Sequence, residues 1–233
     1  SIMRIVKLFV IYLIVIIYSL EILIFLFIPS EQKDMVNVKN TRIKLAKEKK
    51  INFDIRPPEQ VYVDLKSENE SIKPGFLYAK HFSNLKIFKE TKANNRIIPF
   101  RGPINSLTVS CAEDLQYKLI KNDKYGFKNN NIIYANKIQN FLLGDSYAEG
   151  LCENNENDIA GHLNEKKNYT INFGVTGTGP LISLAILREF GNYFKPKNVI
   201  YLYFEGNDLD ELNYEKKDTT LIKYLDDNFN QDY

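Results

Sequence analysis

One stretch decides the fold of this 233-residue chain: Phe141-Leu142-Leu143-Gly144-Asp145-Ser146-Tyr147-Ala148-Glu149-Gly150. A predicted strand begins at Ile138, runs through three apolar residues and stops at Gly-Asp-Ser, where residues suited to the start of a helix follow. In an α/β protein, ligands bind in the crevice outside the carboxyl ends of the strands. We therefore expect Ser146 to lie at a tight strand-to-helix turn with its hydroxyl exposed.

Apolar strands and helical stretches alternate from Ile138 onward. We predict strands at 138–143, 169–173 and 199–204, and helices near 158–164 and 180–193. Short apolar strands separated by helices indicate βαβ units and a parallel sheet that helices cover on both faces. The connections are expected to be right-handed. The fold class is therefore α/β.

Three of the predicted strands end in residues that can carry chemistry. The first ends in Gly144-Asp145-Ser146, the second runs into the glycine-rich segment 172–180 that contains Gly177, and the third ends in Gly206-Asn207-Asp208. Each segment alone has a plain structural reading, as a turn, a site of close packing or a helix cap. Together, at successive strand ends, they supply the separate parts that acyl transfer needs.

This order of segments resembles the first three sequence blocks of the SGNH/GDSL hydrolase family, over roughly Asn140 to Leu212. In finer detail, Tyr125-Gly126-Phe127 and the ending Glu205-Gly206-Asn207-Asp208 resemble membrane-anchored members encoded among bacterial surface-polysaccharide functions. The resemblance implies a flavodoxin-like three-layer α/β/α sandwich, which agrees with the predicted strands and helices.

The resemblance also implies roles for individual residues. Ser146 would be the nucleophile, and its own N–H, the N–H of Gly177 and the side-chain amide of Asn207 would form an oxyanion hole. Asp145 is expected to hold the turn by hydrogen bonds rather than to react. The remaining supporting positions are Gly144, Gly206 and Asp208.

The family's fourth block, Asp-x-x-His, has no counterpart in this sequence. Its histidine activates the serine and its aspartate orients the histidine. The chain has two histidines, His81 and His162, and the positions three residues before them are Tyr78 and Ile159. We expect His81 at the surface and His162 in a surface or core role. Since serine without a base is a poor nucleophile, we expect the natural protein to continue beyond Tyr233.

An apolar run near the N-terminus, 8–28, is long enough to cross the ~30 Å hydrocarbon core of a bilayer. Arg4 and Lys7 precede it, and no small-residue cleavage pattern follows Ile28. We expect an uncleaved signal anchor, with a removed signal peptide or a buried core helix as the alternatives. The predicted organisation is an anchor at 1–30, a linker at 31–66 and an SGNH-like domain at 67–233 that is incomplete at its C-terminus.

The linker and the start of the domain carry weaker patterns. We predict a short helix at 40–50, capped by Asn40 or Thr41, and an edge strand at 61–65, where Val, Val and Leu alternate with Tyr and Asp. Segment 67–105 is expected to form loops with short strands. Further strands are predicted at 107–111 and 117–120, followed by an aromatic turn at 122–127 that packs onto the main domain.

Charge bears on partners and on compartment. Thirty-one basic and 29 acidic residues give a net charge of +2, so no large basic field indicates nucleic acid. Basic residues such as Lys33, Lys39 and Arg42 after the apolar run would keep the domain in the cytoplasm. The short N-terminal tail and the two cysteines favour export. We expect an extracytoplasmic domain, periplasmic or at the cell surface, held to the membrane by the N-terminal helix.

The two cysteines are Cys111 and Cys152. If they pair, loop closure would stabilise the fold by ~4 kcal/mol; two buried free thiols are the alternative. No cluster has the spacing of metal ligands, and we expect neither a metal nor another cofactor.

We expect a serine esterase that acts on an ester-bearing small molecule or carbohydrate, with O-acetyl groups of a surface carbohydrate as one candidate substrate. An O-acetyltransferase is a close alternative. A non-catalytic carbohydrate-binding or polysaccharide-assembly protein, which keeps the crevice without a working base, is the alternative from another class.

Overall fold

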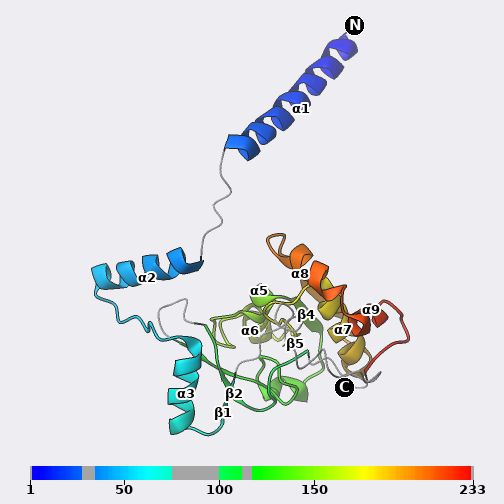
Figure 1. Cartoon of the computed structure of the whole chain (residues 1–233). Helices are drawn as coiled ribbons and strands as arrows, with labels where there is room; N and C mark the ends of the chain where they lie inside the picture. Colours follow the sequence, from blue (N-terminus) through cyan, green and yellow to red (C-terminus); the bar gives the residue numbers. More distant parts are fainter. Residues whose placement is uncertain (1, 28–34, 75–99, 112–116, 232–233) are drawn as a thin grey trace. The chain divides into compact units, whose positions relative to one another are not determined.

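The computed structural model describes residues 2–27, 35–74, 100–111 and 117–231 (Figure 1). The chain divides into two compact units, residues 1–52 and 53–233. Segment 53–66, which the sequence placed in a linker, therefore belongs to the second unit. His81 lies outside the described residues.

The first unit contains two described helices, α1 (Ile2–Phe27) and α2 (Met35–Lys49). In α1 the window Val6–Leu23 has a mean hydropathy of 2.3 and none of it is buried, so the helix is long and apolar enough to cross a membrane. Helix α2 begins five residues before Asn40, so the predicted start and cap are wrong. No proline or glycine interrupts residues 35–49, and nothing in the sequence therefore stops the helix from extending.

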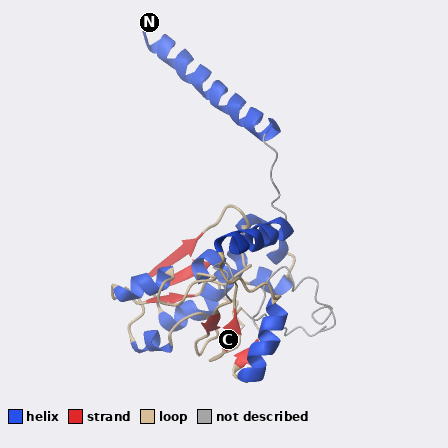
Figure 2. Cartoon of the chain, turned by 90° about the vertical axis from the view of Figure 1, so that its left-hand side faces the viewer, coloured by secondary structure: helices blue, strands red, loops and turns tan. Residues whose placement is uncertain are grey.

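The main sheet lies in the second unit and is parallel (Figure 2). Strand β4 (Asn140–Gly144) is central, between β5 (Thr170–Asn172) and β6 (Asn198–Leu202). Its register pairs Phe141 with Ile171 on one side and Val199 on the other. The helices that follow these strands are α5 (Ser146–Glu149), α6 (Ile159–Glu165), α7 (Pro180–Phe194), α8 (Asp208–Glu215) and α9 (Thr219–Lys223). The predicted alternation of strands and helices is confirmed.

Helices pack on both faces of β4. Successive side chains of a strand point to opposite faces, so the apolar residues of β4 are divided between two clusters. Phe141 and Leu143 belong to a large apolar core together with side chains of α7. Leu142 belongs to a smaller cluster with Ala148 of α5 and Ala160 of α6. The strand that leads to the serine turn is thus buried along its whole length.

Strand β6 does not follow the prediction that both faces of the sheet are covered. Val199 is 46% exposed and Tyr201 37% exposed, and Tyr203 and Phe204 beyond the strand are exposed as well. The physical reason is that α8, the helix that follows β6, packs against α7, so that among the described residues no helix covers the face of β6 that carries Val199 and Tyr201. The apolar character of this segment does not arise from burial in the described part of the chain.

A second, smaller sheet precedes the main one. Strand β2 (Leu107–Val109) pairs in parallel with β1 (Ile72–Lys73) and antiparallel with β3 (Leu119–Lys121). The two strands predicted at 107–111 and 117–120 are confirmed, the first with an earlier end and the second shifted toward Lys121.

The predicted edge strand at 61–65 is wrong, because these residues lie in helix α3 (Pro58–Glu68). Val61 is 1% exposed and Val63 is 59% exposed, whereas a strand would place both on one face. Five residues of alternation are too few to distinguish the helical period of about 3.6 residues from the strand period of 2. Pro58 was the better signal, since proline suits the first turn of a helix, where its missing N–H has no partner to lose.

The segment after β3 packs onto the main domain, as predicted. The rings of Phe127 and Phe173 meet edge to face with centroids 4.7 Å apart, and Tyr125 contacts the core beside them. A short 3₁₀ helix, η1 (Asn131–Ala135), follows. Cys111 and Cys152 form a disulfide with a Cα–Cα distance of 5.4 Å, which joins the end of β2 to the loop after α5.

Candidate functional site

Ser146 lies at a tight turn where β4 ends and α5 begins. Gly144 has a φ of +140°, and a Cβ there would lie 2.7 Å from the carbonyl oxygen of Leu202, so only glycine lets the neighbouring strand approach. Asp145 is 1% exposed and caps α5, because its Oδ1 accepts a 2.9 Å hydrogen bond from Tyr147 N. Ser146 is the first residue of the helix and is partly buried.

The turn after β6 carries Asn207 and Asp208. Asp208 is buried and its Oδ2 accepts hydrogen bonds from Phe204 N at 3.0 Å and Tyr201 Oη at 2.9 Å. Burial and the Asp208 carboxylate raise the pKa of Tyr201. Gly206 allows the turn to pass the ring of Phe204, which a Cβ would approach to 2.6 Å. Asp208 thus shapes the turn that presents Asn207.

Asp145 brings the first and third strand ends together. Its Oδ2 lies 3.5 Å from Ser146 Oγ and accepts a 3.1 Å hydrogen bond from Asn207 Nδ2. The amide nitrogen has two hydrogens, of which Asp145 takes one. The buried Oδ1 of Asn207 has no partner among the described residues. Ser146 and Asn207 therefore lie around one carboxylate oxygen, and one amide hydrogen of Asn207 remains for another acceptor.

Gly177 follows the second strand end. Val175 N donates to the carbonyl oxygen of Gly144 at 3.0 Å, so the loop after β5 continues alongside the serine strand. Gly177 has a φ of +76°, a conformation that favours glycine. Among the described residues, no hydrogen bond joins Gly177 to Ser146 or Asn207. The structure thus brings Gly177 to the same end of the sheet as the serine turn.

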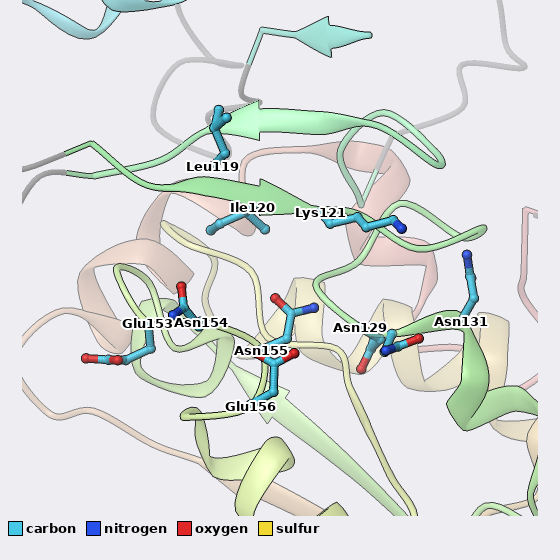
Figure 3. Close-up of a pocket in the computed structure, with 10 residues that line it drawn as sticks. Leu119, Ile120, Lys121, Asn129, Asn131, Glu153, Asn154, Asn155 and Glu156 are labelled. Carbon is cyan, nitrogen blue, oxygen red and sulfur yellow. The ribbon is translucent and has the colours of Figure 1, made fainter.

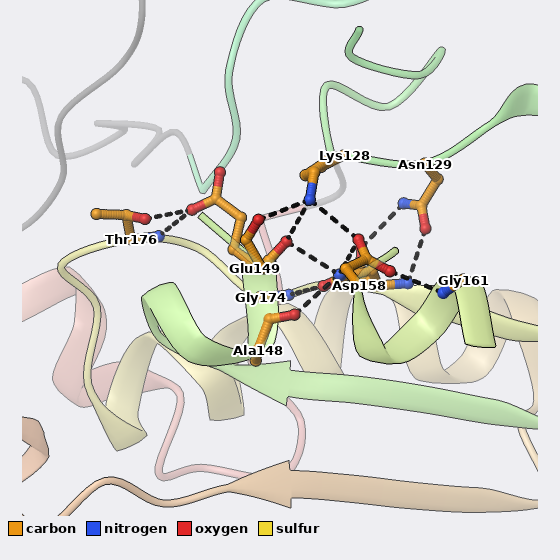
Figure 4. A network of polar contacts seen from close by, with 10 residues as sticks. Lys128, Asn129, Ala148, Glu149, Asp158, Gly161, Gly174 and Thr176 are labelled. Atoms are coloured by element: carbon orange, nitrogen blue, oxygen red, sulfur yellow. Dashed lines mark hydrogen bonds and ion pairs between the residues drawn. The ribbon is translucent and has the colours of Figure 1, made fainter. Parts of the chain in front are cut away.

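Sequence reasoning missed a buried polar network around the C-terminal end of α5 (Figure 4). Lys128 is 3% exposed, and its Nζ donates to the carbonyl oxygens of Glu149 and Gly150 and to Asp158 Oδ2, at 3.1, 2.7 and 3.1 Å. Asn172 Nδ2 donates to the carbonyl oxygen of Ala148 at 2.8 Å. Both side chains satisfy helix-end carbonyls that would otherwise lack partners.

The network extends away from the serine turn. Asn129 Oδ1 accepts from Asn172 N at 2.8 Å, and Asn129 Nδ2 donates to Asp123 Oδ2 at 2.8 Å. Burial raises the pKa of Asp123, although Tyr134 and Asn129 donate to its carboxylate. The one signal in the sequence was Asn172 itself, a polar residue within an apolar strand.

A second missed pair lies closer to the serine. Glu149 Oε2 accepts hydrogen bonds from Thr176 N at 2.7 Å and Thr176 Oγ1 at 2.5 Å (Figure 4). Partial burial raises the pKa of this carboxylate, while the bonds from Thr176 and the charge of Lys128 act in the opposite direction. The pair joins the last residue of the serine helix to the residue before Gly177.

The described histidine does not reach the site. His162 lies on α6 with its side chain 63% exposed, and its Nδ1 is 3.5 Å from Glu165 Oε2. It is a surface residue, one of the two roles expected for it. Within the described ranges, no three His, Cys, Asp or Glu side chains gather closely enough to hold a metal ion.

Cavities of about 230, 240 and 480 Å³ lie near the network, and Ser146 lines none of these. A polar cavity of about 240 Å³ lies between β3 and loop 153–156 and has Lys121, Asn155 and Glu156 in its lining (Figure 3). A larger cavity of about 480 Å³ lies between the small sheet and the main domain. Glu149 and Thr176 line the larger one, so this pair borders both the cavity and the serine turn.

The arrangement places a hydroxyl, an amide and a glycine turn at the carboxyl end of a parallel sheet, with a buried carboxylate beneath them. Comparisons of the chain with protein-family models, with curated proteins and with solved structures find no match.

Proposed function

We propose that residues 53–233 contain an ester-processing serine site of the SGNH/GDSL type. The observation that carries this proposal is the convergence of Ser146 and Asn207 on Asp145 Oδ2, at 3.5 and 3.1 Å. Two residues 61 positions apart, at the ends of two parallel strands, meet where ligands bind in such sheets. Strand order β5-β4-β6 and helices on both faces of β4 support a flavodoxin-like three-layer sandwich.

In the proposed reaction, Ser146 Oγ attacks the carbonyl carbon of an ester and its proton passes to a base, the role that the family resemblance assigns to the histidine of an Asp-x-x-His block. The carbonyl oxygen becomes an oxyanion, which the N–H groups of Ser146 and Gly177 and the free hydrogen of the Asn207 amide stabilise. Such donors contribute about 3 kcal/mol each when they are aimed at the developing charge. The protonated base gives this proton to the departing oxygen, which leaves as the alcohol. Water or a second hydroxyl then loses a proton to the same base, attacks the acyl carbon and releases the serine, which regains its proton.

Asp145 acts as a positioning residue in this scheme. Its buried carboxylate holds the Asn207 amide nitrogen toward the serine and caps α5 at the same time. Its two oxygens thus align the nucleophile and one oxyanion donor from a single side chain.

Helix α1 supports a membrane-anchored protein, and the Cys111–Cys152 disulfide supports an extracytoplasmic domain, because disulfides persist in oxidising compartments. A carbohydrate ester, such as an O-acetyl group on a surface polysaccharide, is the substrate class that the family resemblance favours. Transfer of the acyl group to a second sugar would make the same site an O-acetyltransferase.

A serine-directed fluorophosphonate probe tests this proposal on the full-length natural protein. We expect labelling of Ser146 that is lost in Ser146→Ala and retained in Ser67→Ala, which changes an exposed serine on α3. An intact natural protein that resists the probe at Ser146 would rule the enzyme out.

A non-catalytic carbohydrate-binding or assembly role is the second candidate. One observation favours it: the described histidine, His162, lies at the surface. In that case Ser146 would remain unlabelled, while Ser146→Ala would leave binding of a polysaccharide unchanged.

A further inference from the structure

The carboxylate of Glu149 has no part in the reaction as described above, yet it belongs to a partly buried residue on the serine helix. Glu149 ends α5, three residues after Ser146. A carboxylate in such surroundings is costly unless hydrogen bonds satisfy it. Its known partners are the N–H and the hydroxyl of Thr176, 27 residues further along the chain.

The backbone that carries this carboxylate is held firmly. Lys128 Nζ and Asn172 Nδ2 both donate to the carbonyl oxygen of Glu149, at 3.1 and 3.3 Å. Gly174 lies against the same turn, since a Cβ there would be 2.1 Å from Glu149 N. The loop after β5 therefore passes in direct contact with the end of the serine helix, and Glu149 extends from a fixed point.

Thr176 is the residue before Gly177, so whatever holds Thr176 sets the direction of the next peptide group. Both hydrogen bonds end on the same oxygen, Glu149 Oε2, which fixes the Thr176 backbone and its side chain together. Gly177 has a φ of +76° and no side chain to pack. Its N–H consequently depends on its neighbour for orientation.

We propose that Glu149 is a positioning residue that locks the Thr176–Gly177 turn to the serine helix and so aims the Gly177 N–H at the oxyanion. This role rests on the proposed esterase function. Through Glu149, the helix that carries Ser146 and the turn that carries Gly177 move as one body. The nucleophile and the second backbone donor of the oxyanion hole therefore keep a fixed relative position.

The charges around Glu149 are consistent with this role. The charge of Lys128 favours the ionised form of Glu149, and the charge of Asp145 opposes it. Glu59 and Arg101 line the same 480 Å³ cavity. The two hydrogen bonds from Thr176 to one oxygen distinguish Glu149 from a solvated surface carboxylate.

The test compares Glu149→Ala, Glu149→Gln and Thr176→Val in the full-length natural protein, with p-nitrophenyl acetate as substrate. We expect Glu149→Ala to lower kcat about 100-fold with KM within twofold, because small misplacements of catalytic groups have effects of that size. Glu149→Gln keeps an acceptor oxygen and should restore kcat to within about tenfold of the wild type. Glu153→Ala, an exposed glutamate on the following loop, is the matched control and should leave kcat unchanged.

Thr176→Val removes the hydroxyl and keeps the N–H, so its loss of kcat should be smaller than that of Glu149→Ala. The double variant should be no worse than Glu149→Ala alone, since both changes act on one interaction. Hydrogen–deuterium exchange of peptide 174–179 adds a readout that does not require activity. We expect faster exchange in Glu149→Ala and wild-type exchange in Glu153→Ala.

The outcomes separate the two proposals. A wild-type protein with no activity and no fluorophosphonate labelling overturns the proposed function and the positioning role together. An active wild type with an equally active Glu149→Ala variant overturns only the positioning role. Unchanged exchange of peptide 174–179 in Glu149→Ala also overturns it, as does a failure of Glu149→Gln to recover kcat in a variant that folds.

Discussion

Lys128 shows how much a single residue can hold in this protein. Lysine is almost never fully buried unless its charge is paired, and here the side chain is 2% exposed. Its ammonium group has three hydrogens and three described acceptors, two of them carbonyl oxygens at the end of the serine helix and the third Asp158. Asp158 in turn caps α6, because its Oδ1 accepts a hydrogen bond from Gly161 N. Lys128 is thus the common partner of two helix ends.

We expect Lys128→Met to destabilise the protein by about 3–5 kcal/mol, because it leaves the buried Asp158 carboxylate without its cation. Chemical unfolding followed by near-UV circular dichroism is a suitable measurement, since the chain has 15 tyrosines and no tryptophan. Lys137→Met at an exposed position is the control and should change the unfolding free energy by no more than about 0.5 kcal/mol. A loss below about 1 kcal/mol for Lys128→Met would contradict the pairing.

At the scale of elements, α7 begins without a capping side chain of its own. Gly179 is its N-cap and Pro180 its first residue, so the N–H groups of the first turn have to find partners elsewhere. Glu215, at the end of α8, supplies them by accepting from Gly179 N, Leu181 N and Ile182 N at 2.5, 2.9 and 3.4 Å. Glu215, which lies 34 residues after Leu181 in the chain, therefore completes the start of α7 from the end of a later helix.

Glu215 makes stability depend on pH. Burial raises its pKa from the ordinary 4.5 to about 7 in the folded protein. The folded state then binds the proton more tightly than the unfolded state does. The stabilisation from protonated Glu215 is therefore complete below about pH 4.5 and is lost as pH rises through 7. The unfolding free energy of the wild type should fall as pH rises from about 4.5 to 8. We expect Glu215→Gln to make this fall smaller by up to about 3 kcal/mol.

The measurement is chemical unfolding at pH 4.5, 6 and 8 for the wild type, Glu215→Gln and the exposed control Glu165→Gln. Part of the slope should remain in Glu215→Gln, because burial also raises the pKa values of Glu149 and Asp123. A profile identical to that of the wild type would show that Glu215 does not titrate in this range.

At the scale of the molecule, the second unit combines a small mixed sheet with the parallel sheet that ends at the serine. The Cys111–Cys152 disulfide joins the two, from the end of β2 to the loop after α5. Cys152 has a φ of +72°, an uncommon backbone conformation for a residue with a side chain. The serine helix is thus held by Lys128 and Asn172 at its end and by the disulfide shortly beyond it.

We expect replacement of both cysteines by serine to lower the unfolding free energy by about 4 kcal/mol, from the loop-closure entropy of a 41-residue separation. Chemical unfolding with and without reductant measures it. Reductant should lower the unfolding free energy of the wild type by a similar amount and leave that of the double variant unchanged. A wild type that does not respond to reductant, with both thiols titratable after unfolding, would show that the bond is absent.

Local patterns were enough to predict most of the main sheet. The segments 138–143, 169–173 and 199–204 each combine apolar runs with turn formers, and all three are strands of one parallel sheet. Helix α7 begins at the predicted Pro180, and α6 lies in the predicted segment 158–164, where Asp158 is its N-cap. Where the pattern was short, as at 61–65, helix and strand periods could not be told apart, and the prediction was wrong.

The sequence by itself determined where the serine turn lies, because Gly144, Asp145 and Ser146 are defined by their neighbours in the chain. Only the tertiary structure decided what surrounds it: Asn207 on Asp145, Thr176 on Glu149, and Lys128 on the end of α5. These contacts join residues that lie 21 to 62 positions apart. No local pattern encodes such pairs, since they form only when the packing of the sheet and its helices brings the strand ends together.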